Sequence, residues 1–343
     1  MAEIKLRVGV IGLGMGKAHA KGVKMTEGAE LYAICDNDEQ TLREAGNDLG
    51  VERRYLDYKD MIADGNLDAV IIASPDQDHR EMIENCLQAG LHIMCEKPLA
   101  LTREDIDAIV AAVRGSDRKF MVGQICRYTP GFKKAKEIIE SGAIGELTFV
   151  ESEYAHDYVK VFAKRGGNWR CDPQRNGVVG GGCHAVDLLR WIAGDPYEVM
   201  AYGVHKTFAE LTPYDDTHVA IMRFPNKVIG KVFISISCKR DYTMRSVFYG
   251  TEGTIICDNT SPEITVFKKE VFPGMDNHEM PIKVKVDINN HNAAGEFKEF
   301  YDCIVNGKPI ATTVEEGANT IAACLAIMDS AGSGQLATPK YFD

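Results

Sequence analysis

Two side chains in this sequence are placed to move a proton. Lys97 follows an apolar stretch that ends in "HIMCE", and Pro98 restricts the backbone directly after it. His184 follows three glycines in "GGGCHAVDLL", in the first turn of a predicted helix. Partial desolvation favours the neutral amine of a lysine, and the positive end of a helix dipole disfavours imidazolium, so both groups could accept a proton. The ordinary alternatives are a solvated turn for Lys97 and a buried imidazole for His184.

A glycine-rich turn near the amino terminus indicates a nucleotide site. Gly12, Gly14 and Gly16 close a predicted strand and open a predicted helix, which lets the backbone approach a pyrophosphate. The third glycine of the usual pattern would fall on Lys17. Asp36 ends the next strand about 20 residues later, where a carboxylate can bind the ribose hydroxyls of NAD and repel the 2′-phosphate of NADP. A tight turn and a surface aspartate are the alternative, but the combined context predicts NAD.

The predicted secondary structure that positions these residues differs between the first and the later part of the 343-residue chain. Up to about residue 124, all-apolar runs such as "DAVIIAS" alternate with helical segments, which is typical of a parallel sheet covered on both faces. Later strands, such as "LTFVESEYA", follow one another with little helical punctuation, which favours antiparallel pairing. We therefore predict an α/β fold in two domains. Residues 1–123 form a Rossmann domain with a doubly wound parallel sheet, and residues 124–343 form an α/β domain with a large, mainly antiparallel open sheet.

Composition excludes several classes of partner. The 39 basic and 50 acidic residues give a formal charge of −11, and no run of Lys and Arg is interleaved with aromatics, so we expect no nucleic acid. No apolar run approaches the ~20 residues of a membrane helix, and the start, "IKLRVGVIG", lacks a signal-peptide pattern, so we expect a cytoplasmic protein. The ten cysteines are scattered without a C-x-x-C pair, which predicts neither disulfides nor a metal site.

Three stretches, in one order along the chain, resemble the Gfo/Idh/MocA family of oxidoreductases. Ser74 to Thr102 is similar to the segment that leads to the family's E-K-P motif, Gly123 to Leu147 to its domain crossover, and "GGGCHAVDLLRWIAG" to its active-site helix. The resemblance implies an NAD(P)-dependent dehydrogenase that acts on a small sugar, inositol or related polyol. It also implies a homo-oligomer, a dimer or tetramer, formed through the sheet of the second domain.

The resemblance further implies roles for individual residues. The family lysine and histidine that match Lys97 and His184 act on the substrate hydroxyl as the catalytic pair, and Glu96 is expected to support Lys97. We therefore expect cofactor contacts from Gly12, Gly14, Met15, Gly16, Asp36, Ser74, Pro75, His79, Glu96 and Lys97. From the family's crossover pair and a loop that covers the substrate, we expect substrate contacts from Lys97, Arg127, Tyr128, Trp169, Arg170 and His184. For the crossover pair and the loop residues, core packing or a surface salt bridge is the alternative.

The sequence departs from the family pattern at Gly180. Many family dehydrogenases carry an aspartate at this position, four residues before the histidine, and the glycine removes its charge. Asp187 resembles the aspartate of the family's H-x-x-D, and we interpret it as a group that orients or anchors the helix. His156 and Asp157 are weaker candidates for the pocket.

The leading hypothesis is reversible oxidation of a secondary hydroxyl of a sugar, glycoside or cyclitol to the keto compound. The cofactor takes the hydride, and Lys97 and His184 handle the proton. One alternative is a redox-neutral glycosidase or lyase, in which tightly bound NAD transiently oxidises a hydroxyl. Another is a non-catalytic regulator that senses NAD or a sugar on the same fold.

Overall fold

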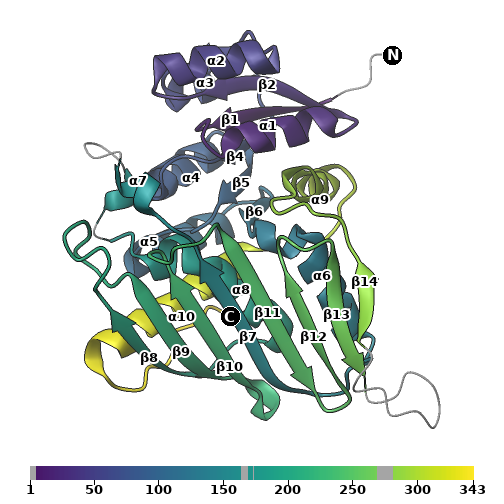
Figure 1. Ribbon diagram of the computed structural model, residues 1–343. Coiled ribbons are helices and arrows are strands. Elements are labelled where there is room, and N and C mark those ends of the chain that lie inside the picture. Colours follow the sequence, from purple (N-terminus) through teal and green to yellow (C-terminus); the bar gives the residue numbers. More distant parts are fainter. Residues whose placement is uncertain (1–4, 164–168, 173, 269–280) are drawn as a thin grey trace. The chain divides into compact units, whose positions relative to one another are not determined.

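The computed structural model describes residues 5–163, 169–172, 174–268 and 281–343. The chain divides into two compact units, each built around its own sheet (Figure 1). The first unit runs to Ile125 and includes Asn292–Ala318 and Asp343, and the second contains Cys126–His291 and Asn319–Phe342. In these described ranges no helix is long and apolar enough to cross a membrane.

A six-stranded parallel sheet forms the core of the first unit. Its strands are β1 (Leu6–Ile11), β2 (Ala29–Cys35), β3 (Arg54–Tyr55), β4 (Ala69–Ile72), β5 (His92–Glu96) and β6 (Phe120–Gly123). They lie in the order β3-β2-β1-β4-β5-β6, and every residue of β4 and β6 is buried, as expected for strands covered on both faces. The order reverses between β1 and β4, which is where a doubly wound sheet opens its ligand crevice. The predicted Rossmann fold is confirmed.

The connections of this sheet are helical. They are α1 (Gly16–Met25), α2 (Glu39–Leu49), α3 (Tyr58–Ala63), the 3-10 turn η1 (Asp76–Asp78), α4 (His79–Gln88) and α5 (Arg103–Arg114). Helix α2 shows how local sequence sets their bounds. Asp38 caps its start by accepting a hydrogen bond from the Thr41 amide at 2.7 Å, and Gly50 ends it at φ +64°, a conformation that favours glycine.

The first unit also takes up a segment from late in the chain. Helix α9 (Ala293–Val305) packs against α1, where a Cβ on Gly22 would lie 2.9 Å from the Ala293 carbonyl oxygen. The Val122 amide of β6 donates to the Thr312 carbonyl at 2.8 Å. The sequence-based division at residue 123 does not include this return, because the pairing of two helix surfaces leaves no local signal in the sequence.

An eight-stranded sheet forms the core of the second unit. Its strands are β7 (Leu147–Ala155), β8 (Glu198–Val204), β9 (Thr217–Arg223), β10 (Ile229–Ser235), β11 (Thr243–Gly250), β12 (Gly253–Asp258), β13 (Glu263–Lys268) and β14 (Ile282–Lys285). They lie in the order β14-β13-β12-β11-β7-β10-β9-β8, and only the pair of β7 and β10 is parallel. The predicted, mainly antiparallel sheet is confirmed.

Helices pack on one face of this sheet. They include α6 (Pro130–Glu140), α8 (Cys183–Ala193) and α10 (Val314–Ser333), which starts in the first unit, while α7 (Val159–Ala163) follows β7 (Figure 1). On β9 the buried positions alternate with exposed ones, as a sheet with one packed face requires. The exposed positions are partly apolar: Ile221 is 46% exposed, and Tyr202, which pairs with Val219, is 64% exposed.

Candidate active site

The glycine turn borders a cavity of about 270 Å³ at the carboxyl ends of β1, β2 and β4. Gly12, Asp36, Ser74 and Pro75 line it, and each of them follows one of these strands directly or within two or three residues. Ligands of doubly wound sheets bind at this edge. The structure therefore brings together four of the residues that the sequence assigns to the cofactor, and we call this the cofactor cavity.

Three glycines serve three purposes beside the cofactor cavity. Gly12 has φ +83°, and a Cβ there would lie 2.5 Å from the Ala73 carbonyl oxygen, so the tight turn requires glycine. A Cβ on Gly16 would lie 2.9 Å from Val10, which shows that α1 packs closely on β1. A Cβ on Gly14 would meet nothing within 4 Å, so this backbone is open to a ligand. This division of roles is the one that dinucleotide-binding turns use.

Asp36 is held in place by backbone groups on either side. The Leu13 amide donates to Oδ2 at 2.8 Å, and the Asp38 amide donates to Oδ1 at 3.0 Å. Each carboxylate oxygen has a further lone pair, so both can still accept hydrogen bonds from hydroxyls. Asp36 thus combines a fixed position with free acceptor capacity at the wall of the cofactor cavity.

His79 is a link between two loops and is absent from the residues found to line the cofactor cavity. Its buried ring lies with Nδ1 3.0 Å from the Pro98 carbonyl oxygen and Nε2 3.3 Å from the Ser74 carbonyl oxygen. It joins the loop after β4 to the loop after β5. Asp78 lines the cavity instead, and burial raises the pKa of its carboxyl. Sequence reasoning missed Asp78 because an acidic residue before a helix is common at any helix start.

Glu96 and Lys97 lie at the end of β5, with Lys97 half-buried. The Lys97 amide donates to Glu96 Oε2 at 3.0 Å, and His19 Nε2 lies 2.7 Å from Glu96 Oε1. Burial by itself would raise the pKa of Glu96, but the His19 hydrogen bond and charge, with the charge of Lys97, bring it below the ordinary carboxyl value. Glu96 therefore supports the backbone of Lys97.

His19, on α1, was not identified from the sequence. It is fully buried, and its Nδ1 lies 3.9 Å from Glu296 Oε2 of α9. Burial, followed by the charges of Glu96 and Glu299, raises the pKa of Glu296 well above the ordinary carboxyl value. His19 therefore hydrogen-bonds Glu96, whereas Glu296 lies beyond hydrogen-bond distance of its ring. A single histidine on a helix gives no sequence signal for this arrangement, because its partners lie on β5 and α9.

The glycines before His184 allow a helix to pack closely on the second sheet. Val178–Gly182 form a π-helical turn that leads directly into α8. A Cβ on Gly181 would lie 2.4 Å from the Tyr154 ring, and one on Gly182 would lie 2.5 Å from Ile234. Strands β7 and β10 therefore approach the helix at these two positions. π-Helical turns of this kind are frequent at functional sites.

His184 lies deeper in the helix than the sequence suggests. Helical structure begins before α8, and Asn176 Oδ1 accepts hydrogen bonds from the Val178 and Val179 amides at 2.9 and 3.0 Å. The positive end of the helix dipole thus lies near Asn176, and the dipole argument applies to that end. His184 itself is 3% exposed, with its ring stacked at 6.4 Å from that of Tyr154.

Arg175 occupies the space that a side chain at Gly180 would need. A Cβ on Gly180 would lie 2.5 Å from Arg175 Nη1, and Arg175 Nη2 donates to the Gly180 carbonyl at 3.2 Å. Arg175 is buried, and its guanidinium lies 4.7 Å from the centre of the Trp169 ring; that of Arg170 lies 4.2 Å from the same ring. A guanidinium therefore stands where the resemblance predicts an aspartate in many family members.

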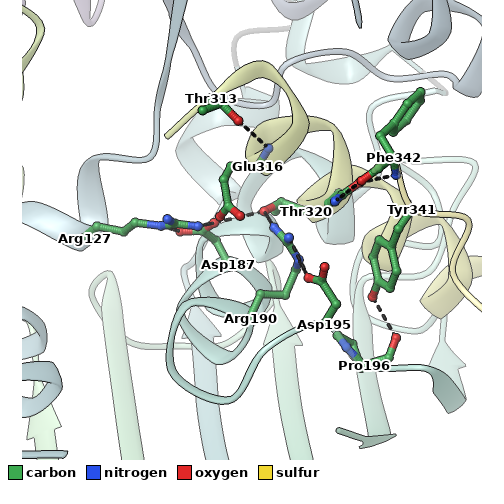
Figure 2. Close-up of polar contacts among 11 residues, drawn as sticks. Arg127, Asp187, Arg190, Asp195, Pro196, Thr313, Glu316, Thr320, Tyr341 and Phe342 are labelled. Carbon is green, nitrogen blue, oxygen red and sulfur yellow. Dashed lines mark hydrogen bonds and ion pairs between the residues drawn. The ribbon is translucent and has the colours of Figure 1, made fainter. Parts of the chain in front are cut away.

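Arg127 makes a buried ion pair at the base of α8. Its Nε and Nη2 donate to the two carboxylate oxygens of Asp187 at 2.8 and 2.7 Å (Figure 2). Thr320 of α10 donates to the same carboxylate at 2.9 Å and accepts from Arg190 at 2.7 Å. Asp187 thus anchors the helix, in line with its interpretation from the sequence. The substrate contact expected of Arg127 stays a prediction, as does that of Tyr128, which is half-buried beside it.

Tyrosine and histidine rings surround His184 in the second unit. His291 lies 6.2 Å from His184 between ring centres, and Tyr242 lies 5.8 Å from His291. His156 and Tyr242 extend this group to a polar cavity of about 480 Å³ that Asp157 and Lys239 also line. Cys126, His184 and His291 bring their potential ligand atoms within 4.8 Å of one another. We call these three residues the Cys–His cluster.

Comparison with known proteins places the chain among oxidoreductases. The model of the GFO_IDH_MocA oxidoreductase family, with an NAD-binding Rossmann fold, matches residues 6–124, and that of the GFO/IDH/MocA C-terminal domain matches residues 132–256. The chain is 32% identical over 322 residues to a myo-inositol 2-dehydrogenase of Thermotoga maritima, covering 91% of this chain and 92% of the relative.

Solved structures share the whole architecture. Myo-inositol 2-dehydrogenase from Lactobacillus plantarum superposes with a TM-score of 0.83 at 26% identity, over 98% of this chain and all of that one. Levoglucosan dehydrogenase in complex with NADH gives a TM-score of 0.90 at 24% identity, over 98% of this chain and all of that one, which shows a common fold.

Proposed function

This chain belongs to the Gfo/Idh/MocA family of NAD-binding oxidoreductases, and we propose that it oxidises a secondary hydroxyl of a sugar, glycoside or cyclitol to the keto compound. The observation that carries the proposal is the setting of His184, buried among tyrosine and histidine rings that reach a polar cavity. Such a cavity can hold a hydroxylated ring, and a histidine there can act on one hydroxyl.

The residues of the first unit would hold NAD, which accepts the hydride when bound. Gly14 would let the backbone approach the pyrophosphate, and Asp36 would accept hydrogen bonds from the ribose hydroxyls. Lys97, supported by Glu96, would take the hydroxyl proton together with His184. One positioned base is enough for the proton transfer, and the second group can anchor the hydroxyl.

The polar cavity of the second unit supports a substrate rich in hydroxyls. Lys160, Lys239 and Arg240 supply donors at its wall, and Asp157 and Asp241 supply acceptors. Lys239 lies 3.4 Å from Asp157, and Arg240 lies 2.6 Å from Glu153, so these charges are largely balanced within the wall. A neutral polyol suits a wall of this kind better than a strongly charged substrate.

A redox-neutral cleavage is the second candidate, and the Arg175 guanidinium beside Gly180 favours it. A transient ketone makes the proton on the neighbouring carbon acidic, and a cation stabilises the negative charge that develops when this proton leaves. A leaving group on the next carbon could then depart, and the hydride would return from the cofactor. Net NADH would not accumulate in this reaction.

One screen tests both candidates. The protein would be incubated with NAD and a panel of monosaccharides, inositols and glycosides, with NADH followed by absorbance and the products analysed. Oxidation predicts one NADH for each keto product, and cleavage predicts free aglycone without net NADH. The absence of both across the panel would contradict the proposal.

We also propose that the sheet of the second unit joins copies of the chain into a homo-oligomer. Tyr202, Val219, Ile221 and Ile229 lie exposed on the face opposite the helices. Apolar side chains gathered on one sheet face favour association. Light scattering would give the oligomeric state, and Ile221→Lys with Val219→Lys should shift it to the monomer.

A further inference from the structure

The three members of the Cys–His cluster come from separate parts of the second unit. Cys126 lies in η2 (Ile125–Tyr128), His184 in α8 and His291 in the loop that follows β14. Cys126 and His184 are 1% and 3% exposed, and His291 is half-buried. One ligand atom from each lies within 4.8 Å of the other two. This spacing is close to what a shared ion requires.

Hydrogen bonds hold the two loops of the cluster together. Thr129, just after Cys126, donates from Oγ1 to the Asn290 carbonyl at 2.7 Å, next to His291. Asn259 donates from Nδ2 to Asn290 Oδ1 at 2.8 Å and accepts from the Met244 amide at 2.8 Å. Met244 Sδ lies 3.5 Å from Cys126 Sγ. The loop of His291 is therefore fixed to the strand that packs against Cys126.

One thiolate and two imidazoles form a donor set that suits zinc. Tetrahedral Zn²⁺ binds sulfur at about 2.3 Å and nitrogen at about 2.0–2.1 Å, which separates its ligand atoms by about 3.4–3.6 Å. The observed spacing needs a contraction of about 1 Å to reach this geometry, which side-chain rotation can supply. Catalytic zinc sites have three protein ligands and keep the fourth position for water or substrate.

We propose that Cys126, His184 and His291 form a zinc site whose fourth position takes the reacting hydroxyl of the substrate. The identity of this fourth ligand rests on the proposed function, whereas the metal site itself rests on the geometry of the cluster. The Cys126 thiolate then supplies a negative charge to a site that lacks the family's aspartate at Gly180. No metal was expected from the sequence, because the three ligands lie far apart along the chain.

An ion held by Cys126, His184 and His291 would lower the pKa of a hydroxyl at its fourth position. Lys97 would take the proton of this hydroxyl. NAD, when bound, would accept the hydride from the same carbon, so the substrate would become a ketone and NAD would become NADH. His184 would act on the hydroxyl through the ion, so the proton-accepting role that the proposed function shares between Lys97 and His184 would fall to Lys97.

Metal binding by the full chain tests the site directly. The protein would be stripped with a chelator, titrated with Zn²⁺ by calorimetry, and loaded with Co²⁺ for absorption spectroscopy. We expect one ion per chain and a thiolate-to-Co²⁺ charge-transfer band. Cys126→Ser should abolish this band, and His291→Gln should weaken Zn²⁺ binding by about 100-fold. The matched controls Cys238→Ser, half-exposed, and His205→Gln, exposed, should leave both measurements unchanged.

The outcomes separate this inference from the proposed function. The zinc site is wrong if the wild-type protein binds no Zn²⁺, or if it binds Co²⁺ without a thiolate charge-transfer band. Both measurements use the wild-type protein, so they do not depend on the folding of a variant. Stripped protein that oxidises a substrate with NAD as fast as the Zn²⁺-loaded protein also overturns the site and leaves the proposed function standing. Stoichiometric Zn²⁺ bound through Cys126, with no NAD-linked oxidation of any substrate, supports the site and contradicts the function.

Discussion

The cofactor cavity lies where three adjacent parallel strands end, whereas the Cys–His cluster brings together residue 126 of a 3-10 turn, residue 184 of a helix and residue 291 of a loop. In the first region, backbone groups do much of the work, and the residues follow their strands in a recognisable spacing. In the second region, side chains would bind the ligand, and the position of each depends on how its own element packs in the second unit. The short spacing of functional residues along the sequence therefore identifies the cofactor cavity, but the residues of the Cys–His cluster have no such spacing.

The largest effect should come from the lysine at the end of β5. Lys97→Met should lower turnover by about 10³-fold or more, because no amine remains to take the proton, while NAD binding stays nearly unchanged. Steady-state kinetics and NAD titration would separate the two. The exposed Lys21→Met on α1 is the control and should behave as wild type. Normal turnover by Lys97→Met would contradict the role of this residue.

The anchor of α8 should dominate the stability of the second unit. Asp187→Asn leaves the buried guanidinium of Arg127 without its charge partner, and we expect a loss of about 3–5 kcal/mol in the free energy of unfolding. Asp195→Asn removes a half-exposed partner of the buried Arg190, which keeps its hydrogen bond to Thr320, so this change should cost less, about 1–2 kcal/mol. Urea unfolding measures both. Equal losses of unfolding free energy in the two variants would mean that burial of the aspartate does not set the strength of the ion pair.

Two neighbouring glycines sharpen the picture of the cofactor cavity. Gly12→Ala should destabilise the first unit by about 1–3 kcal/mol, because φ is +83° and the Ala73 carbonyl blocks a Cβ. The Cβ added by Gly14→Ala has no atom within 4 Å, so the unfolding temperature should stay unchanged. NAD binding should weaken, because the Cβ would lie where the pyrophosphate approaches the backbone. Thermal unfolding and NAD titration distinguish the two variants. Unchanged NAD affinity in Gly14→Ala would place the pyrophosphate elsewhere.

The smallest effect concerns the choice of cofactor. Asp36→Ser removes the carboxylate that repels a 2′-phosphate, so the preference for NAD over NADP should fall by about 10-fold or more. The ratio of kcat/KM for the two cofactors measures it, with Asp38→Ser as the control on the adjacent helix cap. A wild-type preference for NADP would remove Asp36 from its role.

Much of the first unit was predictable because its signals are local. The parallel sheet, the glycine turn and Asp36 follow from strand composition and short spacing. The return of α9 was not predictable, and neither was the position of His19 between Glu96 and Glu296, because both depend on surfaces that meet only after folding. In the second unit the strands were foreseen, but the closeness of Gly181 to Tyr154 was not.

The two sheets, the glycine turn of the first unit and the residues able to do chemistry follow from the amino-acid order alone. Strand period, glycine placement and charge are properties of neighbouring residues, and they act before any long-range contact forms. The tertiary structure alone decided that Arg127 pairs with Asp187, that Arg175 fills the space at Gly180, and that Cys126 meets His184 and His291. Each of these depends on side chains that only packing brings within a few ångströms.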